Sequence, residues 1–479
     1  MIDTSASPSP APASRSAGAS RDATAAARSD PAPRPQRAIP PAAALTRRRF
    51  LSRAAATSLG AVALPVLGSS PRPLRAAPAR GAAQQPALRP PPAAPDEPYW
   101  ELVRAQFPLR EGIVPMNAAN LCPAPRQVID AVTNAMRDVD GDVSFQNRAK
   151  YGDLLDATRD RLASYLGTDA DEIAIVRNTS EANNVIVGGL ELGPGDEVLL
   201  LDQNHATNNV AWDVRAARFG FSVRRIAVEP SLPTPAAVLD AFTRELRPAT
   251  KVLSFTDVSN TTGQRFPTAE LCAAARERGV YTHVDGAQTF GALVRDLHAL
   301  DCDSYAASAH KWFMGPDEAG VLYVRRDRIP QIWPSVVGIG WGSAAETSAD
   351  GARKFETLGQ RNDATIAAFD AALAFHETIG SAVIEARVLE LATALRDRVA
   401  ALPGANLVTP ADPRLRAGVV IARFDAANMG AVYRRLYDEH GIAGASTGGL
   451  RLCPHVYNTM ADVERAAAAV AESVAAARA

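Results

Sequence analysis

Residues 279–316 read GVYTHVDGAQTFGALVRDLHALDCDSYAASAHKWFMGP, and they place a carboxylate and a lysine after two separate apolar runs. Asp285 ends the first run, and Lys311 follows the second run, 26 residues after Asp285. Lysine is rare in this chain, because 47 of its 51 basic residues are arginines. An arginine stays protonated, whereas a desolvated lysine can lose its proton and become a nucleophilic amine. The stretch therefore predicts a chemical role for Lys311, with a plain salt bridge to Asp285 as the structural alternative.

Apolar runs of the same kind recur on both sides of this stretch and alternate with amphipathic segments. Strands that are apolar on both faces and separated by helices predict a mostly parallel sheet that is covered on both sides. We expect seven strands, within the runs EIAIVRN, EVLLLD, SVRRIAV, KVLSFTDVS, VYTHVD, SYAASA and GVLYVR. In α/β sheets of this class, ligands bind at the carboxyl ends of the strands. Asp285 and Lys311 follow two of those ends.

Composition divides the chain into four predicted parts. Residues 1–95 form a leader and linker rich in Ala, Pro, Ser and Arg, and residues 96–130 form an N-terminal segment. Residues 131–345 form the large α/β domain. Long alanine-rich helical segments with short strands between them then predict a smaller α+β domain over residues 346–479.

The charge balance and the cysteines exclude several classes of protein. Residues 1–95 hold 13 arginines and 3 aspartates, so the remaining residues carry 38 basic and 49 acidic side chains, a formal charge of −11. An acidic body argues against nucleic-acid binding and favours a small-molecule substrate. The four cysteines have wide, irregular spacing, which predicts buried thiols and neither a metal site nor a disulfide framework.

The leader contains a segment typical of protein export. Residues 46–51, TRRRFL, resemble the twin-arginine signal, and a weakly apolar stretch follows at residues 54–68. That stretch is too short to span a bilayer comfortably, and no other stretch predicts a membrane anchor. Residues 1–45 have almost no large apolar side chains, which predicts disorder. We expect the chain to fold in the cytoplasm, where any cofactor would be inserted, and then to pass through the twin-arginine machinery to the periplasm.

A lysine and a carboxylate at neighbouring strand ends meet two requirements of pyridoxal 5'-phosphate chemistry. The lysine forms a Schiff base with the cofactor's aldehyde, and the acid keeps the pyridine nitrogen protonated. The motifs HVDGAQ and SAHKWFMGPDEAGVLYV resemble the cofactor signature of the class V aminotransferase family, which includes cysteine desulfurases and isopenicillin N epimerases. Matching motifs run from about residue 113 to residue 460. The resemblance implies a type I pyridoxal phosphate-dependent transferase fold, and a homodimer with active sites at the subunit interface.

The resemblance assigns roles to residues around the cofactor ring. It implies that Lys311 carries the internal aldimine and that Asp285 contacts the pyridine nitrogen. Gln288 and Asn260 would hydrogen-bond the phenolic oxygen, while His205, in DQNHATNNVAW, would lie flat on the ring and shuttle protons. The structural alternative for Asn260 and Gln288 is capping of turn backbone, and a loop histidine is often structural.

The resemblance also implies a phosphate site at the start of a helix, where backbone N–H groups favour anions. Thr179 and Ser180, in VRNTSEANNVIVGG, would bind the phosphate together with Ser308 and His310, which flank the lysine. An ordinary Ser or Thr helix cap has the same local sequence. In KFETLGQRNDA the family often has Gly-Thr where this chain has Gly-Gln, so Gln360 is the predicted phosphate contact from the neighbouring subunit.

The substrate predictions rest on two arginines. Arg451, in GGLRLCPHVYNT, resembles the arginine that binds the substrate α-carboxylate, and a planar guanidinium suits this task. Arg361 is the second predicted substrate contact. Desulfurases carry a nucleophilic cysteine shortly before the substrate arginine, but residues 440–451 contain none, and Cys453 follows Arg451.

The sequence therefore favours chemistry at the α carbon of an amino acid or a related substrate, by aminotransfer or epimerisation. A lyase or cysteine desulfurase is the first alternative, and an exported protein that binds without turnover is the second. The complete set of Lys311, Asp285 and His205 disfavours a non-catalytic protein. A secreted α/β hydrolase is disfavoured because the chain lacks a Gly-x-Ser-x-Gly turn.

Overall fold

The computed structural model describes residues 87–338, 351–425 and 427–478, which belong to one compact unit, Gly81–Ala479. The predicted export signal at residues 46–51 and nearly all of the predicted leader lie outside the described residues. The predicted boundary between residues 345 and 346 also falls outside them. The predicted domain limits therefore stay predictions.

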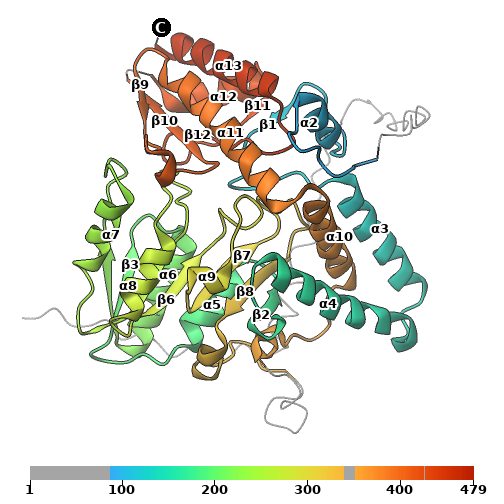
Figure 1. The fold of residues 1–479 in the computed structure, drawn as a ribbon, viewed down its shortest axis with the longest axis vertical. Coiled ribbons are helices and arrows are strands. Elements are labelled where there is room, and N and C mark those ends of the chain that lie inside the picture. The colour runs from blue at the N-terminus through green and yellow to red at the C-terminus, as the bar shows by residue number, and fades with distance from the viewer. Residues whose placement is uncertain (1–86, 339–350, 426, 479) are drawn as a thin grey trace, which may run out of the picture. The chain divides into compact units, whose positions relative to one another are not determined.

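The large sheet has seven strands in the order β2-β8-β7-β6-β5-β3-β4 (Figure 1). They are β2 (Ile173–Val176), β3 (Glu197–Leu201), β4 (Ser222–Ile226), β5 (Thr250–Thr256), β6 (Tyr281–Asp285), β7 (Ser304–Ser308) and β8 (Gly320–Val324). Strand β8 runs antiparallel to both β7 and β2, while the other neighbouring pairs are parallel. The predicted mostly parallel, seven-stranded α/β sheet is confirmed.

Helices cover both faces of this sheet, which explains why its inner strands are apolar throughout. On one face, α5 (Thr179–Gly189) and α6 (Ala206–Phe219) pack on the side chains of Val198 and Leu200. On the other face, α7 (Pro235–Thr243) and α8 (Thr268–Arg276) pack on Leu199 and Leu201, together with a wider core. Alternate residues of β3 therefore face opposite layers, as the strand geometry requires.

A second set of strands joins the two ends of the described chain. Strands β9 (Ala405–Leu407), β10 (Val420–Phe424) and β12 (Leu450–Leu452) form an antiparallel sheet, and β1 (Val114–Pro115) pairs in parallel with β11 (Ile442–Ala443). Their core is shared with α11 (Ser381–Ala400), α12 (Met429–Asp438) and α13 (Met460–Arg478). The predicted helices and short strands of the C-terminal part are therefore present, and the N-terminal segment packs with them.

Three long helices form a further layer beside the large sheet: α3 (Arg126–Gly141), α4 (Phe145–Tyr165) and α10 (Asp363–Ile379). The apolar side of α10, which includes Phe369 and Leu373, belongs to the same core as the large sheet. The shorter elements are α2 (Glu97–Arg104), α9 (Leu297–Leu300) and the 3-10 turns η1 (Ala170–Glu172), η2 (Arg326–Gln331), η4 (Gly351–Glu356) and η5 (Pro413–Leu415). In the described ranges, no helix has the length and apolar character needed to cross a membrane.

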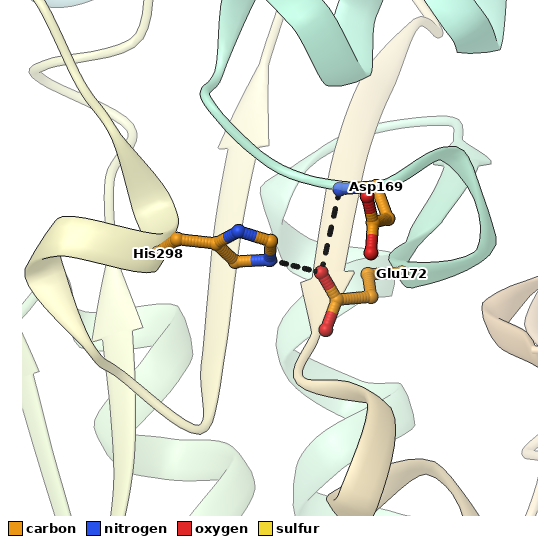
Figure 2. Close-up of side chains that lie close together, drawn as sticks. All are labelled: Asp169, Glu172 and His298. Carbon is orange, nitrogen blue, oxygen red and sulfur yellow. Dashed lines mark hydrogen bonds and ion pairs between the residues drawn. The ribbon is translucent and has the colours of Figure 1, made fainter.

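A small acidic cluster ties η1 to its neighbours (Figure 2). The carboxylate of Glu172 accepts hydrogen bonds from Thr168 Oγ1 at 2.6 Å and from the backbone N–H of Arg326 at 2.8 Å. His298 Nε2, on α9, lies 2.6 Å from the same carboxylate, and the N–H of Asp169 lies 3.4 Å from it. These contacts connect three short segments of the chain and give the cluster a structural role.

Candidate active site

Lys311 and Asp285 come together because their strands are neighbours. Strands β6 and β7 are parallel, with Asp285 beside Ala306 in register. The chain continues through Ser308 and then turns, and Gly315 N–H closes this turn on the carbonyl of Ala309 at 2.8 Å. The turn brings Lys311 back over the strand ends.

Both residues line a cavity of about 400 Å³, which nine of the twelve predicted site residues share. These nine are Thr179, Ser180, His205, Asn260, Asp285, Ser308, His310, Lys311 and Arg451. They come from the ends of different strands, from two helix starts and from the C-terminal sheet. The remaining three predicted residues lie elsewhere.

The environment of Lys311 favours the neutral amine. Burial is the main cause that lowers the pKa of Lys311, and the positive charge of Arg451 adds to it, while Asp285 acts in the opposite direction. Among the described residues, its ammonium forms no ion pair or hydrogen bond. A lysine whose charge is largely desolvated and has no ion-pair partner among the described residues is suited to act as a nucleophile or base.

Asp285 is held at the cavity wall by backbone and amide groups. Its Oδ1 accepts from the N–H of Ala287 at 3.1 Å, and its Oδ2 accepts from Asn183 Nδ2 at 3.3 Å. The next residue must be glycine, because a Cβ at Gly286 would lie 1.9 Å from the ring of Tyr305. This close approach fixes the path of the backbone directly after the carboxylate.

The start of helix α5 forms an anion-binding corner of the cavity. Thr179 N–H donates to Ser308 Oγ at 2.8 Å, and the two hydroxyls lie 2.6 Å apart. The capping residue is Asn178, whose Oδ1 accepts from the N–H of Glu181 at 3.0 Å. Asn178 therefore caps the helix, and the side chains of Thr179 and Ser180 line the cavity. A helix N-terminus with hydroxyl groups around it favours a phosphate.

His205 caps the next helix, α6, from inside the same cavity. Its Nδ1 accepts from the N–H of Thr207 at 3.3 Å, which leaves the proton of the neutral ring on Nε2. Burial lowers the pKa of His205, and the nearby positive charge of Lys311 lowers it further. The ring is therefore neutral at pH 7 and can both accept and donate protons.

Arg451 is a buried cation whose contacts are all to neutral groups. Its NH1 donates to the carbonyl of Asn260 at 3.1 Å, and its NH2 donates to Asn117 Oδ1 at 3.0 Å. The side chain is only 4% exposed, and its buried Nε has no hydrogen-bond partner within the described ranges. No carboxylate of the described chain pairs with it. An isolated buried charge is costly, so this arginine is built to receive an anion.

Gln288 does not line the cavity. Its Oε1 accepts from the indole N–H of Trp312 at 2.8 Å, and its Nε2 donates to the carbonyl of Ala119 at 3.0 Å. The amide thus supports the wall behind the cavity, next to the lysine. Each of these two polar atoms still has a second hydrogen-bonding position, so the contact of Gln288 with the cofactor's phenolic oxygen stays a prediction.

Gln360 and Arg361 lie outside the cavity as well. They line a separate cavity of about 300 Å³, where both guanidinium NH groups of Arg361 donate to the carbonyl of Ile175 at 3.0 Å. Gln360 lies beside Arg148. Within one chain these two residues therefore do not line the cavity of Lys311. A contact from a second subunit stays a prediction.

The cavity also contains polar residues that the sequence analysis missed. Asn120, Asn183, Thr207 and Thr447 line it, and Asn117 holds Arg451 from behind. Asn183 follows Thr179 by one helical turn, a spacing that gives both side chains the same helix face. That spacing was the available signal, whereas Asn117 and Asn120 lie in a segment with no periodic pattern.

The cysteines near the cavity are buried thiols, as predicted. Cys453 is 0% exposed, and burial raises its pKa although Arg451 lies nearby. Burial also raises the pKa of Cys122, whose Sγ lies 3.4 Å from the hydroxyl of Tyr457. A protonated, enclosed thiol is a poor nucleophile.

The comparisons with known proteins agree with this geometry. The sequence profile described as "Aminotransferase class-V" matches residues 117–473. This chain belongs to the class V aminotransferase family. Two proteins that are similar to this chain are named for different reactions, an epimerisation and a desulfuration. The isopenicillin N epimerase of Amycolatopsis lactamdurans is 34% identical over 392 residues, which covers 78% of this chain and 98% of that protein. A probable cysteine desulfurase of Xylella fastidiosa is 32% identical over 333 residues, covering 66% and 78%.

Solved structures confirm the predicted type I fold. The complex of the cystine C-S lyase C-DES with its reaction product cysteine persulfide superposes on the class V chain with a TM-score of 0.71 at 26% identity. The superposition covers 77% of this chain and 99% of the C-DES chain. The cysteine desulfurase CsdA of Escherichia coli has a TM-score of 0.70 at 24% identity and covers 79% and 99%, a likeness of fold alone.

Proposed function

We propose that this class V enzyme holds pyridoxal 5'-phosphate through Lys311 and epimerises an amino acid or an amino-acid-derived substrate at its α carbon. The observation that carries the proposal is Arg451. It is a buried cation in the same cavity as the reactive lysine, and it has no carboxylate partner in the described chain. A substrate carboxylate would supply that partner by two parallel hydrogen bonds.

The residues of the cavity fit the cofactor. A lysine with a lowered pKa suits an aldehyde, a buried carboxylate suits a protonated ring nitrogen, and the start of α5 suits a phosphate. When bound, pyridoxal phosphate supplies an electron-withdrawing ring that stabilises negative charge at the substrate's α carbon. Lys311, Asp285 and Thr179 would hold its aldehyde, ring nitrogen and phosphate.

Two residues of the chain, Lys311 and His205, can carry out the proton transfers. The amine of Lys311 can take a proton from the substrate, and burial, by lowering its pKa, favours the neutral form that this role requires. Neutral His205 lines the same cavity and is a second proton carrier. Epimerisation returns the proton to the opposite face of the α carbon, so two carriers around one cavity support this reaction. The similarity to isopenicillin N epimerase over 98% of that protein supports it as well.

Elimination at the side chain of the substrate is the second candidate, and the likeness to the C-S lyase C-DES favours it. A desulfurase reaction is less well supported, because it needs an accessible protein thiolate. Cys453 is fully enclosed, and burial keeps its thiol protonated. We expect Cys453→Ser to keep full activity with every substrate.

The reaction is tested with purified holoenzyme in D₂O and a panel of L- and D-amino acids. Epimerisation gives deuterium at the α carbon and the opposite enantiomer, detected by mass spectrometry and chiral chromatography. Arg451→Gln should raise KM for these substrates while cofactor absorbance is retained. Formation of a 2-oxo acid that depends on an added acceptor would establish aminotransfer instead. Release of ammonia with pyruvate or sulfide would establish elimination.

We also propose a homodimer that shares its active sites. The position of Gln360 and Arg361 in a separate cavity supports this, because in the described chain they do not line the cavity of Lys311 and would need a second chain to take part in an active site. Large apolar side chains such as Phe145, 88% exposed, and Trp333, 66% exposed, support a protein interface. Mixing inactive Lys311→Ala chains with impaired Gln360→Ala chains should restore activity, since one mixed site then has both native residues. No recovery after subunit exchange would contradict shared sites.

Export to the periplasm is proposed from the leader alone. Paired arginines followed by Phe50-Leu51 and an apolar stretch support a twin-arginine signal. Replacing Arg47 and Arg48 by lysine preserves the charge but should retain a tagged protein in the cytoplasmic fraction. Periplasmic recovery of this double variant at the normal level would exclude the twin-arginine route.

A further inference from the structure

A chain of buried polar side chains lies behind the cavity and ends on Asp285. Ser304 Oγ lies 2.8 Å from His283 Nδ1, and His283 Nε2 lies 2.9 Å from Asn183 Oδ1. Asn183 Nδ2 then donates to Asp285 Oδ2 at 3.3 Å. All four side chains are buried, and those of His283 and Ser304 have no exposed surface. We name this set the Asp285 relay.

The fold aligns the relay on one face of the large sheet. His283 and Asp285 are two residues apart on β6, so both side chains lie on the same face. Ser304 is the neighbour of His283 on β7, and Ser254 is its neighbour on β5. Asn183 comes from α5, which covers this face. Ser254 Oγ is buried next to the relay but has no hydrogen-bond partner among the described residues.

Burial keeps the central histidine neutral. It lowers the pKa of His283 to about 3, so at pH 7 one ring nitrogen donates and the other accepts. If Nε2 carries the proton, it donates to the carbonyl oxygen of Asn183, and Ser304 donates to Nδ1. The NH₂ group of Asn183 is then directed toward Asp285.

The opposite tautomer of His283, with its proton on Nδ1, is incompatible with this arrangement of donors and acceptors. An unprotonated Nε2 would have to accept from the NH₂ group of Asn183. The amide oxygen would then face the carboxylate of Asp285, so two acceptors would meet without a proton between them. The protonated Nε2 of His283 and the donor directed at Asp285 therefore require each other.

We propose that His283 and Asn183 are positioning residues that direct a hydrogen-bond donor onto Asp285 and thereby keep a proton on the cofactor's ring nitrogen. This inference rests on the proposed binding of pyridoxal phosphate with Asp285 at that nitrogen. Lys311 and His205 interact electrostatically with this carboxylate, and Arg451 and His310 are charged or titratable groups that line the same cavity. A donor to Oδ2 restricts the carboxylate to one orientation, with its remaining lone pairs available to the ring.

The direct readout is the protonation of the ring nitrogen, measured by ¹⁵N NMR of holoenzyme loaded with labelled cofactor. We expect the wild-type nitrogen to stay protonated between pH 6 and pH 9, about the range in which enzymes are assayed. In His283→Phe and Asn183→Ala it should be partly deprotonated within that range. Turnover should fall by about 10- to 100-fold, by analogy with the loss seen when the outer hydrogen-bond partners of metal ligands are removed, with KM nearly unchanged.

Two further variants separate the relay from mere packing. His283→Gln retains an N–H donor near the position of Nε2 and should restore a protonated ring nitrogen. Ser254→Ala changes a buried hydroxyl beside His283 that is outside the relay, and it should match the wild type. If His283→Phe does not fold, Asn183→Ala and His283→Gln still decide the question.

The outcomes distinguish this inference from the proposed function. A wild-type protein that binds no cofactor would contradict the proposed function itself. A protonated ring nitrogen and normal turnover in Asn183→Ala would overturn the relay alone. An effect of Ser254→Ala equal to that of Asn183→Ala would also overturn it, because general loosening of the core would then explain both.

Discussion

His283 and His298 both belong to clusters that contain a carboxylate, but the protein surrounds them differently. His283 is fully buried and reaches Asp285 only through the amide of Asn183. His298 is half exposed and contacts Glu172 directly at 2.6 Å (Figure 2). Burial makes the first histidine a neutral connector, while the second remains in contact with water.

The difference shows that proximity of a histidine and an acid does not by itself indicate function. Inside the sheet, each polar atom must find a protein partner, so the order of donors and acceptors is fixed. At the surface, water and salt weaken an ion pair to about 0–1 kcal/mol. Changes around Asp285 should therefore alter catalysis, and changes around Glu172 should alter stability alone.

The largest effect is expected from Lys311→Ala. Turnover should fall by more than roughly 10⁴-fold, as happens when a residue that forms a covalent bond is removed. Lys150→Ala is the matched control, since Lys150 is an exposed lysine paired with Asp138. Borohydride reduction of the holoenzyme should fix the cofactor to the peptide with Lys311. A label on Lys150, Lys251 or Lys354 would contradict the site.

Asp285→Asn should come next. Loss of the charge should slow α-proton exchange by about 10²–10³-fold, a typical loss for an electrostatic contact to the reacting system. The cofactor should remain bound, as its absorbance would show. Asp169→Asn, in the cluster of Figure 2, should leave the rate unchanged. Equal rates of α-proton exchange in Asp285→Asn and the wild type would show that Asp285 has only a structural role.

Glu172→Gln should lower the free energy of unfolding by about 1–2 kcal/mol and leave turnover unchanged. Burial raises the pKa of Glu172, but hydrogen bonds from Thr168, His298 and the backbone of Arg326 outweigh it, so the pKa is lowered. A carboxyl with a lowered folded-state pKa stabilises the protein above its unfolded value of about 4.3.

This stabilisation is lost as the pH falls through the folded-state value. The stability difference between the wild type and Glu172→Gln should thus be complete at pH 7 and shrink below about pH 4. Urea unfolding at several pH values measures it. A difference in unfolding free energy that grows as the pH falls would contradict the lowered pKa of Glu172.

The smallest effect is expected from His298→Ala. The pair with Glu172 is partly exposed, so its loss should cost about 0–1 kcal/mol of unfolding free energy and should matter less at high salt. Denaturation at low and high ionic strength tests this. A loss of turnover in His298→Ala would show that the Glu172 cluster affects catalysis as the Asp285 relay does, and would contradict the comparison.

The sequence predicted the large sheet well because each strand is a short apolar run, which is a local signal. Through the family resemblance it also predicted nine of the lining residues, of which eight lie at or shortly after the ends of those runs and the ninth, Arg451, lies on β12. Gln288 illustrates the limit. Its neighbours are known only once the indole of Trp312 and the carbonyl of Ala119 are placed, and these come from distant segments.

The relay was missed for a related reason. His283 and Asp285 are adjacent on one strand face, but Asn183 joins them only because α5 packs on that face. Asn117 reaches Arg451 through the pairing of the chain's N-terminal and C-terminal segments. Contacts that depend on how two elements pack leave no periodic pattern in either element.

The pairing of β1 with β11 also determines which parts of the protein can fold first while the chain is being synthesised. Val114 lies beside Ile442, and Asn117 lies beside Cys453, so segments more than 300 residues apart close on each other. At about 5–20 residues per second, the ribosome needs on the order of ten seconds to extend the chain from Lys311 to Ile442. During that interval the cofactor-binding strand ends can fold without the arginine of β12. A nascent chain could therefore acquire its cofactor before it is able to hold a substrate, because the substrate-binding arginine is added only with β12.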